Sequence, residues 1–360
     1  MSAKSTVPRP ALTRRQFAAL GAAGAASLAL PALSVDVKPE KARVVIAVSG
    51  KASLYYLPLT IAEQLGYFRA EGLDVEISDV AGGARAVQAL AGGAADIISG
   101  PYEQTIQQQA KAQGQGLGQA LQAFVLLGRA PQIAMGVSTR TLPQYRGVAD
   151  LRGRKVGVTA PDSPTHMMAH LLLSRGGLKP AEVNFVGVGN AAGALASMRA
   201  GQIDAISNVD PVMTLLEQRG EVKIIGDTRT LKGTLEVFGG PMPAGCLLAP
   251  VEFIARHPAT AQALANAVVH ALKWLQTAGP SDIIKTVPES HMFGDRALYL
   301  NAFNKVREAL SLDGLMSDDG ARTALKALAS MDAAIRPEKI ELARTYTNQF
   351  SRRAKDRFKA

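Results

Sequence analysis

The sequence predicts an α/β protein built from two lobes. Nine short apolar runs rich in β-branched residues are typical of buried strands, and helical stretches with caps or breakers lie between most of them. Repeated strand–helix–strand units favour parallel sheets covered by helices on both faces. The chain has 360 residues, of which 47% are hydrophobic, so it is long enough for two lobes with separate cores.

The strands and helices follow from hydrophobic periodicity and from glycine and proline positions. The predicted strands are 43–48, 73–80, 96–99, 124–127, 133–138, 155–159, 183–188, 203–207 and 222–225. One predicted helix starts at Pro58, runs through Ile61, Leu65 and Phe68, and ends at Gly72, a suitable left-handed stop. The other predicted helices include 84–90, 102–112, 163–174, 212–218 and 259–277, the last carrying the lone Trp274. Glycine at every second position predicts a flexible loop at 113–119.

The pattern changes after residue 245, where helical periodicity dominates and only Leu247 and Leu248 are strand-like. Two stretches punctuated by glycine and proline, 129–136 and 236–245, are therefore the expected hinge crossovers between the lobes. The first lobe would comprise residues 43–132 plus 246–360, and the second lobe residues 133–240.

The N-terminus has the features of an export signal. The first 34 residues hold four basic residues and no acid, and Arg14 and Arg15 directly precede an apolar run from 17 to 33. Ala32 and Ser34 then occupy positions −3 and −1 of a cleavage site after Ser34. Residues 1–34 resemble a twin-arginine signal, which a receptor reads and which is not an anchor. The formal charge of +10 alone would suggest nucleic acid as a partner, but an exported protein is not expected to bind it.

Metal and cofactor sites are not expected. The single cysteine, Cys246, can form neither an internal disulfide nor a cysteine-based metal site. His166 and His170 share a helix face, but no glutamate follows the first histidine, as the zincin pattern requires, and no third ligand is evident.

Ligands of open α/β sheets bind beyond the carboxyl ends of the strands, where helix N-termini offer free N–H groups. The strand predictions nominate five such loops, rich in hydroxyls, amides and small residues: 49–56, 99–102, 159–166, 187–191 and 208–211. Such loops suit a small anion. Each polar residue in them could instead be only a helix cap or turn residue.

Several motifs in family order resemble the nitrate/sulfonate/taurine-type substrate-binding proteins of ABC transporters. They are PLTIAEQLGYFRAEGLDVE and GGARAVQALAGGAADI within 53–98, DLRGRKVGVTAPDSPTH at 150–166, AGQIDAISNVDP at 200–211 and EVFGGPMPAG at 236–245. The resemblance spans about 43–280 and implies a type II periplasmic-binding-protein fold, with two α/β lobes joined by a two-stranded hinge. The ligand contacts that it implies are Ser53, Tyr55, Tyr56, Ser99, Gly100, Thr159, Ser163, Thr165, Asn208 and Asp210, and we expect His166 to line the same cleft.

The resemblance implies an exported, periplasmic receptor and not an enzyme. The receptor would act as a monomer, capture a small anionic or zwitterionic solute such as a sulfonate, taurine or nitrate, and deliver it to an ABC permease in the inner membrane. An enzyme on the same fold would resemble the pyrimidine-precursor synthases, whose cysteine-rich cluster this chain lacks.

Three questions stay open at this point. Asp210 is either an amine-binding acid or the cap of a helix. The ligand could also be a pyrimidine or thiamine precursor or an aromatic acid. The receptor could serve a sensory partner instead of a permease.

Overall fold

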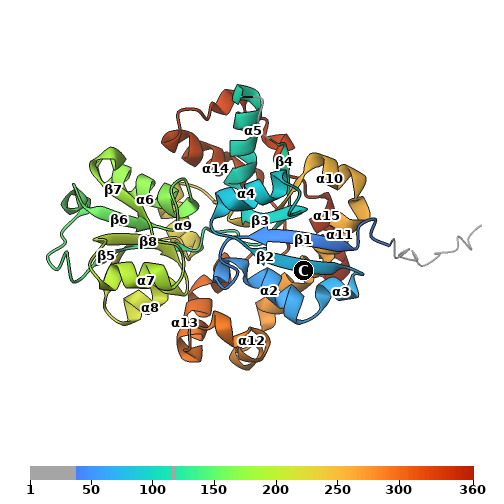
Figure 1. Cartoon of the computed structure of the whole chain (residues 1–360), viewed down its shortest axis with the longest axis horizontal. Coiled ribbons are helices and arrows are strands. Elements are labelled where there is room, and N and C mark those ends of the chain that lie inside the picture. Colours follow the sequence, from blue (N-terminus) through green and yellow to red (C-terminus); the bar gives the residue numbers. More distant parts are fainter. Residues whose placement is uncertain (1–37, 116–118) are drawn as a thin grey trace, which may run out of the picture. The chain divides into compact units, whose positions relative to one another are not determined.

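The computed structural model describes residues 38–115 and 119–360 (Figure 1). The expected export signal at 1–34 lies outside the described residues, as do residues 116–118 of the expected glycine-rich loop. That loop begins later than expected, because the helix α5 extends to Gln115. The Gln113 side chain within it donates a hydrogen bond of 2.9 Å to the carbonyl of Lys339.

The first sheet has the strand order β2-β1-β3-β10-β4. Its strands are β1 (Arg43–Val48), β2 (Asp74–Asp79), β3 (Ile97–Pro101), β4 (Leu121–Leu126) and β10 (Gly245–Pro250). Residues of β1 alternate between two cores, as the period of a strand requires. Val44, Ile46 and Val48 pack with α2 and α11, whereas Ala47 packs with α4 and α5.

The second sheet has the order β7-β6-β8-β5-β9. Its strands are β5 (Ile133–Ser138), β6 (Lys155–Val158), β7 (Asn184–Gly187), β8 (Ala205–Val209) and β9 (Val222–Asp227). Ile133, Met135 and Val137 face the helix α6, and Ala134 faces α7 and α8. Helices therefore cover both faces of both sheets, which confirms the predicted α/β class with two lobes.

The expectation of parallel sheets is wrong for one strand in each sheet. β5 is antiparallel to β8 and β9, and β10 is antiparallel to β3 and β4. Each is the first strand after the chain crosses from the other sheet. The crossing into β5 contains no helix, and the crossing into β10 contains only α9 (Leu231–Phe238), which packs on β9 and α6 of the lobe that the chain is leaving. Neither strand is therefore reached through the helical crossover that would make it parallel to its neighbours.

The helices follow the predicted caps with one exception. They are α2 (Leu57–Gln64), α3 (Tyr67–Ala70), α4 (Gly83–Ala91), α5 (Glu103–Gln115), α6 (Pro164–Arg175), α7 (Ala192–Arg199), α8 (Val212–Gln218), α9 (Leu231–Phe238), α10 (Val251–Arg256), α11 (Pro258–Thr277), α12 (Pro280–Thr286), α13 (Arg296–Val306), α14 (Asp318–Met331) and α15 (Gln349–Phe358). Single 3-10 turns lie at Leu54–Tyr56 (η1), Val148–Leu151, Pro180–Glu182, Glu289–His291, Arg307–Ala309, Pro337–Lys339 and Leu342–Arg344. The exception is the helix expected from Pro58 to Gly72, which splits into α2 and α3 because Gly66 adopts a left-handed conformation with φ of 72°.

Two segments, 127–132 and 228–244, connect the sheets and pair with each other at both ends. At one end the Gln132 N–H donates to the carbonyl of Thr228 at 3.1 Å, and at the other the Ala244 N–H donates to the carbonyl of Gly128 at 2.8 Å. This pairing makes the connection a double strand of chain, so that the two segments must bend together.

The C-terminal part of the chain contacts helices of both lobes. α11 and α15 pack on each other and on the first lobe, while α13 contacts α8 and α14 contacts α5 and α6. Among the described residues, no helix is both long enough and apolar enough to cross a membrane.

We expect the last helix to be an integral part of the first core. The ring of Phe350 is 1% exposed and meets the ring of Phe124 edge to face, with centroids 6.1 Å apart. Phe350→Ala should lower the free energy of unfolding by about 3–5 kcal/mol in urea titrations. Arg352→Ala, an exposed neighbour, is the control and should change it by no more than about 0.5 kcal/mol. A neutral Phe350→Ala would show that α15 only rests on the surface.

Candidate functional site

The carboxyl ends of the parallel strands place loops of the two sheets next to each other. The Leu54 N–H donates to the carbonyl of Asp210, and the Asn190 side-chain amide donates to the carbonyl of Ser49, both at 3.3 Å. Ser49 and Leu54 follow β1, whereas Asn190 and Asp210 follow β7 and β8. Because ligands bind at this edge of open α/β sheets, the candidate site is built from both groups of loops.

The loop after β1 buries three predicted site residues in the turn η1. Ser53, Tyr55 and Tyr56 are each 5–7% exposed. Ser53 stands at the N-cap, but its side chain makes no capping hydrogen bond. The two tyrosine rings meet edge to face with centroids 5.1 Å apart. Burial raises the pKa of both phenols, so they stay neutral, and the Tyr55 hydroxyl has no hydrogen-bond partner within the described chain.

The end of β3 carries more buried polar groups than the sequence analysis named. Ser99 is 1% exposed and its hydroxyl has no partner. Glu103 and Gln104, the first residues of α5, are 5% and 7% exposed, and each keeps one side-chain oxygen without a partner. The Gln104 amide lies against Gly100, where a Cβ would displace it. The sequence signal for these groups was the pair of polar residues, Glu103 and Gln104, at the start of a helix that directly follows a strand.

Tyr55 and a further missed residue, Gln132, lie beside two glycines that are hydrogen-bonded to each other, Gly245 and Gly128. A Cβ at Gly245 would meet the Tyr55 ring at 2.9 Å, and Gly245 pairs with Pro101 of β3. Gln132, in the first connecting segment, is 1% exposed, and neither atom of its amide has a partner. Its nitrogen lies 2.8 Å from where a Cβ of Gly128 would be, and the Gly128 N–H donates to the carbonyl of Gly245. We call Tyr55, Ser99, Glu103, Gln104 and Gln132 the first-lobe cluster.

Glu103 is the titratable centre of this cluster. Burial raises the pKa of its carboxyl from 4.5 to about 7, and a hydrogen bond from its own backbone N–H only partly opposes the rise. The ionisable groups coupled to it are Tyr55, Tyr102 and Cys246. Burial raises the pKa of all three, so each is neutral near pH 7. Cys246 is accordingly a poor nucleophile, because nucleophilic attack requires the thiolate.

Three predicted residues of the second lobe form a hydroxyl triangle. The side-chain oxygens of Thr159, Ser163 and Thr165 lie 2.8–3.1 Å from one another. Ser163 also caps the twelve-residue helix α6 by accepting from the His166 N–H. The triangle therefore sits at a helix N-terminus, where the helix dipole favours a negative group.

His166 is fixed inside the second lobe. Its Nδ1 accepts a hydrogen bond of 3.0 Å from the Asp162 N–H, and its ring packs on Phe185 with centroids 4.2 Å apart. Burial lowers the pKa of His166, so the ring is neutral with its proton on Nε2. The structure does not join it to a metal centre: within the described ranges, no three histidine, cysteine, aspartate or glutamate side chains are grouped to hold a metal ion.

Asn208 is used entirely within its own lobe. Its amide donates to the carbonyl of Gly189 at 2.8 Å and accepts from the Val209 N–H at 2.9 Å. The preceding residue, Ser207, is fully buried and its hydroxyl has no partner. Asn208 therefore ties the end of β8 to the loop after β7.

Asp210 is a helix cap and an ion-pair partner. One carboxylate oxygen accepts from the Thr214 N–H in α8 at 2.7 Å, and the other lies 3.4 Å from a guanidinium nitrogen of Arg229. Burial raises the pKa of Asp210, while Arg229 and Thr214 oppose that rise. The structure thus accounts for both carboxylate oxygens without a ligand.

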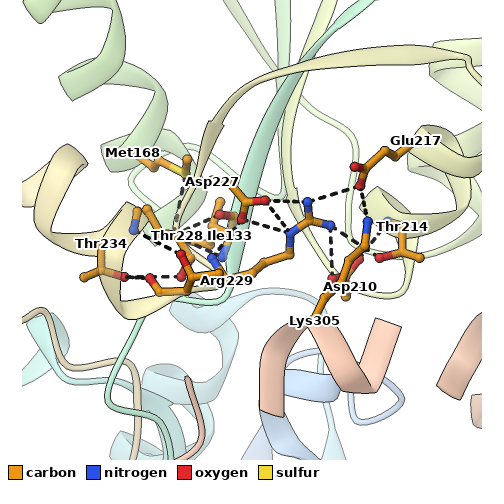
Figure 2. Close-up of polar contacts among 12 residues, drawn as sticks. Ile133, Met168, Asp210, Thr214, Glu217, Asp227, Thr228, Arg229, Thr234 and Lys305 are labelled. Atoms are coloured by element: carbon orange, nitrogen blue, oxygen red, sulfur yellow. Dashed lines mark hydrogen bonds and ion pairs between the residues drawn. The ribbon is translucent and has the colours of Figure 1, made fainter. Parts of the chain in front are cut away.

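Arg229, which the sequence analysis missed, is the centre of this network (Figure 2). It is 2% exposed and binds Asp227 at 2.6 Å and Glu217 at 3.1 Å, besides Asp210. Burial alone would lower the pKa of Arg229, but these carboxylates raise it. Glu217 also accepts a hydrogen bond of 2.5 Å from Lys305 of α13, which connects the network to the C-terminal part of the chain (Figure 2).

The five nominated loops contain one lysine or arginine, Lys51, and it is paired with Glu63 at 2.8 Å. Arg229 of the second connecting segment is surrounded by carboxylates. These five loops therefore offer an anion hydroxyls and backbone N–H groups, and their one cation is already paired.

Comparison with known proteins agrees with the two-lobed α/β fold. Residues 53–279 match the sequence model of the family described as NMT1/THI5 like, and the chain belongs to that family. A solved structure from Bordetella bronchiseptica RB50 is 53% identical, covers 90% of this chain and 100% of its own, and has a TM-score of 0.85.

More distant solved structures share the fold. The periplasmic nitrate-binding protein NrtA of Synechocystis PCC 6803 is 15% identical with a TM-score of 0.71, covering 89% of this chain and 90% of its own. The alkanesulfonate-binding protein SsuA of Xanthomonas axonopodis pv. citri, bound to MOPS, is 18% identical with a TM-score of 0.65, covering 86% and 99%. The predicted fold and family resemblance are confirmed. The desulfurization enzyme DSZB also has this fold, with 14% identity and a TM-score of 0.59 over 88% of this chain and 99% of its own.

We expect the buried arginine to be essential for folding. Arg229→Met leaves the carboxylate of Asp210 buried without its counter-ion and should lower the free energy of unfolding by about 3–5 kcal/mol. Adding Asp210→Asn should restore part of this loss, which urea titrations of both variants would measure. Arg256→Met, which breaks only an exposed pair with Glu252, should cost no more than about 0.5 kcal/mol. If the losses in the free energy of unfolding from Arg229→Met and Asp210→Asn were strictly additive, the two residues would not be energetically coupled.

Proposed function

We propose that this protein is an exported receptor of an ABC importer and captures a small solute between its two lobes. The observation that carries the proposal is the first-lobe cluster, whose buried polar atoms lack partners at the edge where α/β sheets bind ligands. More than about nine in ten buried polar groups in proteins are hydrogen-bonded. Of the other such groups, Ser207 lies in β8 directly before Asn208, whereas those on Thr141, His170, His257 and Gln262 lie outside the five nominated loops and the first-lobe cluster.

The ligand class that we propose is a small anionic or zwitterionic solute, such as a sulfonate, taurine or a nitrate-like anion. The hydroxyl triangle at the N-terminus of α6 supports it, because hydroxyls and first-turn N–H groups bind oxyanions without a fixed cation. Oxygen atoms of the solute would take hydrogen bonds from Thr159, Ser163 and Thr165 in the second lobe.

Capture would proceed by closure of the two lobes, residues 43–132 plus 246–360 and residues 133–240. The paired connecting segments support this motion, and the expected hinges at 129–136 and 236–245 overlap them. Gly239, with φ of 75°, is a suitable point of bending there. The ligand stabilises the closed form only through the contacts that form on closure.

The partners that we propose are an inner-membrane permease and the twin-arginine export machinery, with a monomer working in the periplasm. Two observations support a binding protein over an enzyme. The cysteine of the chain is buried and protonated, and the groups at the strand edge include no nucleophile paired with a base.

A thermal-shift screen of the purified protein would test the proposed ligand class. The panel comprises nitrate, taurine, alkanesulfonates, aromatic acids, thiamine precursors and nucleotides. A ligand at 100 times its Kd should add about 2.7 kcal/mol and raise Tm by several degrees. If nitrate, taurine and alkanesulfonates leave Tm unchanged in protein that native mass spectrometry shows to be ligand-free, the proposed ligand class is contradicted.

Two variants, one in each lobe, test whether the ligand contacts both lobes. Ser99→Ala and Thr159→Val each remove one hydroxyl and should weaken binding about tenfold, as expected for the loss of one buried hydrogen bond. Ser174→Ala, at the exposed end of α6, is the control. Unchanged affinity in both variants would place the ligand elsewhere.

Export can be tested separately from binding. Replacing Arg14 and Arg15 by lysine should leave uncleaved precursor in the cytoplasm, which cell fractionation and immunoblotting would detect. Arg9→Lys, outside the arginine pair, should leave export unchanged. Normal export of the double-lysine variant would contradict a twin-arginine route.

A further inference from the structure

We infer that Glu103 determines the specificity of this receptor: its carboxylate accepts a hydrogen bond or ion pair from a nitrogen donor of the ligand. The receptor would therefore select solutes with an amino or protonated nitrogen group over anions of similar shape that lack one. The inference rests on the proposed function and names the chemical class that the same site takes.

The surroundings of Glu103 give it no structural partner. It opens α5 directly beyond the end of β3, is 5% exposed, and has one oxygen without a hydrogen bond. The groups coupled to it are the neutral side chains of Tyr55, Tyr102 and Cys246. A carboxylate that is buried without a cation or a set of donors destabilises the fold. A ligand donor would remove that cost.

The neighbours of Glu103 also favour a ligand that carries hydrogen-bond donors. Gln104, the next residue, also presents an unpartnered carbonyl oxygen, which lies close to Gly100 at the end of β3. Tyr55 and Ser99 carry hydroxyls, which can donate or accept. A nitrate ion or a plain sulfonate carries only acceptors and would meet the Glu103 carboxylate unfavourably. A ligand with an N–H group would give the unpartnered oxygen of Glu103 a hydrogen-bond donor.

Asp210 cannot fill this role as the structure stands. Its two carboxylate oxygens are bound by Thr214 and Arg229, so a ligand amine would have to displace a buried ion pair. Glu103 lies in the opposite lobe from the hydroxyl triangle. A zwitterion could thus place its nitrogen against Glu103 and its oxyanion against Thr159, Ser163 and Thr165, which would couple binding to closure.

The protonation of Glu103 adds a pH dependence. A pKa of about 7 means that the carboxylate form grows about tenfold between pH 6 and pH 8. A cationic nitrogen should therefore bind about tenfold more tightly at pH 8. The neighbouring Tyr55, Tyr102 and Cys246 stay protonated across this window, because burial raises the pKa of each.

Calorimetry on matched ligand pairs tests the inference. The pairs are taurine with ethanesulfonate, β-alanine with propionate, and 4-aminobenzoate with benzoate, at pH 6 and pH 8. At least one nitrogen-bearing member should bind about tenfold or more tightly than its partner. In Glu103→Gln this preference and the gain at pH 8 should both disappear, whereas Glu252→Gln, an exposed glutamate on α10, should keep them.

The outcomes separate the two proposals. Tight binding of plain anions, or a nitrogen preference that survives Glu103→Gln, would overturn the role of Glu103 and leave the receptor function intact.

A measurement of thermal stability without ligand gives a second test. Glu103→Gln should raise Tm at pH 8 more than at pH 5, because the folded protein favours the protonated acid and loses stability as pH rises from 4.5 to about 7. A lower Tm at pH 8 would assign Glu103 a structural role and overturn the inference.

Discussion

The buried guanidinium of Arg229 is the interaction on which the geometry of the binding edge depends. It lies just after β9, at the start of the second connecting segment, and joins the carboxylates of Asp210, Asp227 and Glu217. Since an isolated charge cannot be buried without a large penalty, these elements must stay together once Arg229 is inside. Through Glu217 the same network reaches Lys305, so the C-terminal part of the chain is tied to the second lobe.

The two lobes contribute different kinds of surface to the candidate site. In the second lobe, Asn208, Asp210 and the hydroxyl triangle already have internal partners, which fixes them in place before a ligand arrives. In the first lobe, Tyr55 and Glu103 have polar atoms that the fold does not satisfy. Proteins tolerate such local conflicts mainly where function requires them. A preorganised lobe facing an unsatisfied one suits a receptor that closes on its solute.

The antiparallel strands β5 and β10 explain why the two lobes stay connected yet separate. Each strand runs from the crossing into its sheet next to an edge strand, with neighbours on both sides. The connecting segments therefore begin and end in rigid cores, and hydrogen bonds at both ends hold them together. Any relative motion of the lobes must be absorbed in the short stretches between, which include Gly128 and Gly239.

Local patterns in the sequence determined the strands β1 and β5, the cap at Ser163 and the loops that follow the strands, because periodicity and capping depend on neighbours along the chain. The family resemblance nominated the loops of the candidate site. Only the tertiary structure decided the direction of β5 and β10, the partners of Asp210 and the isolation of Glu103. Strand direction, ion pairing and burial all depend on contacts between segments distant in sequence. A sequence pattern shows that a residue is suited to an interior, but it does not show which groups will surround it there.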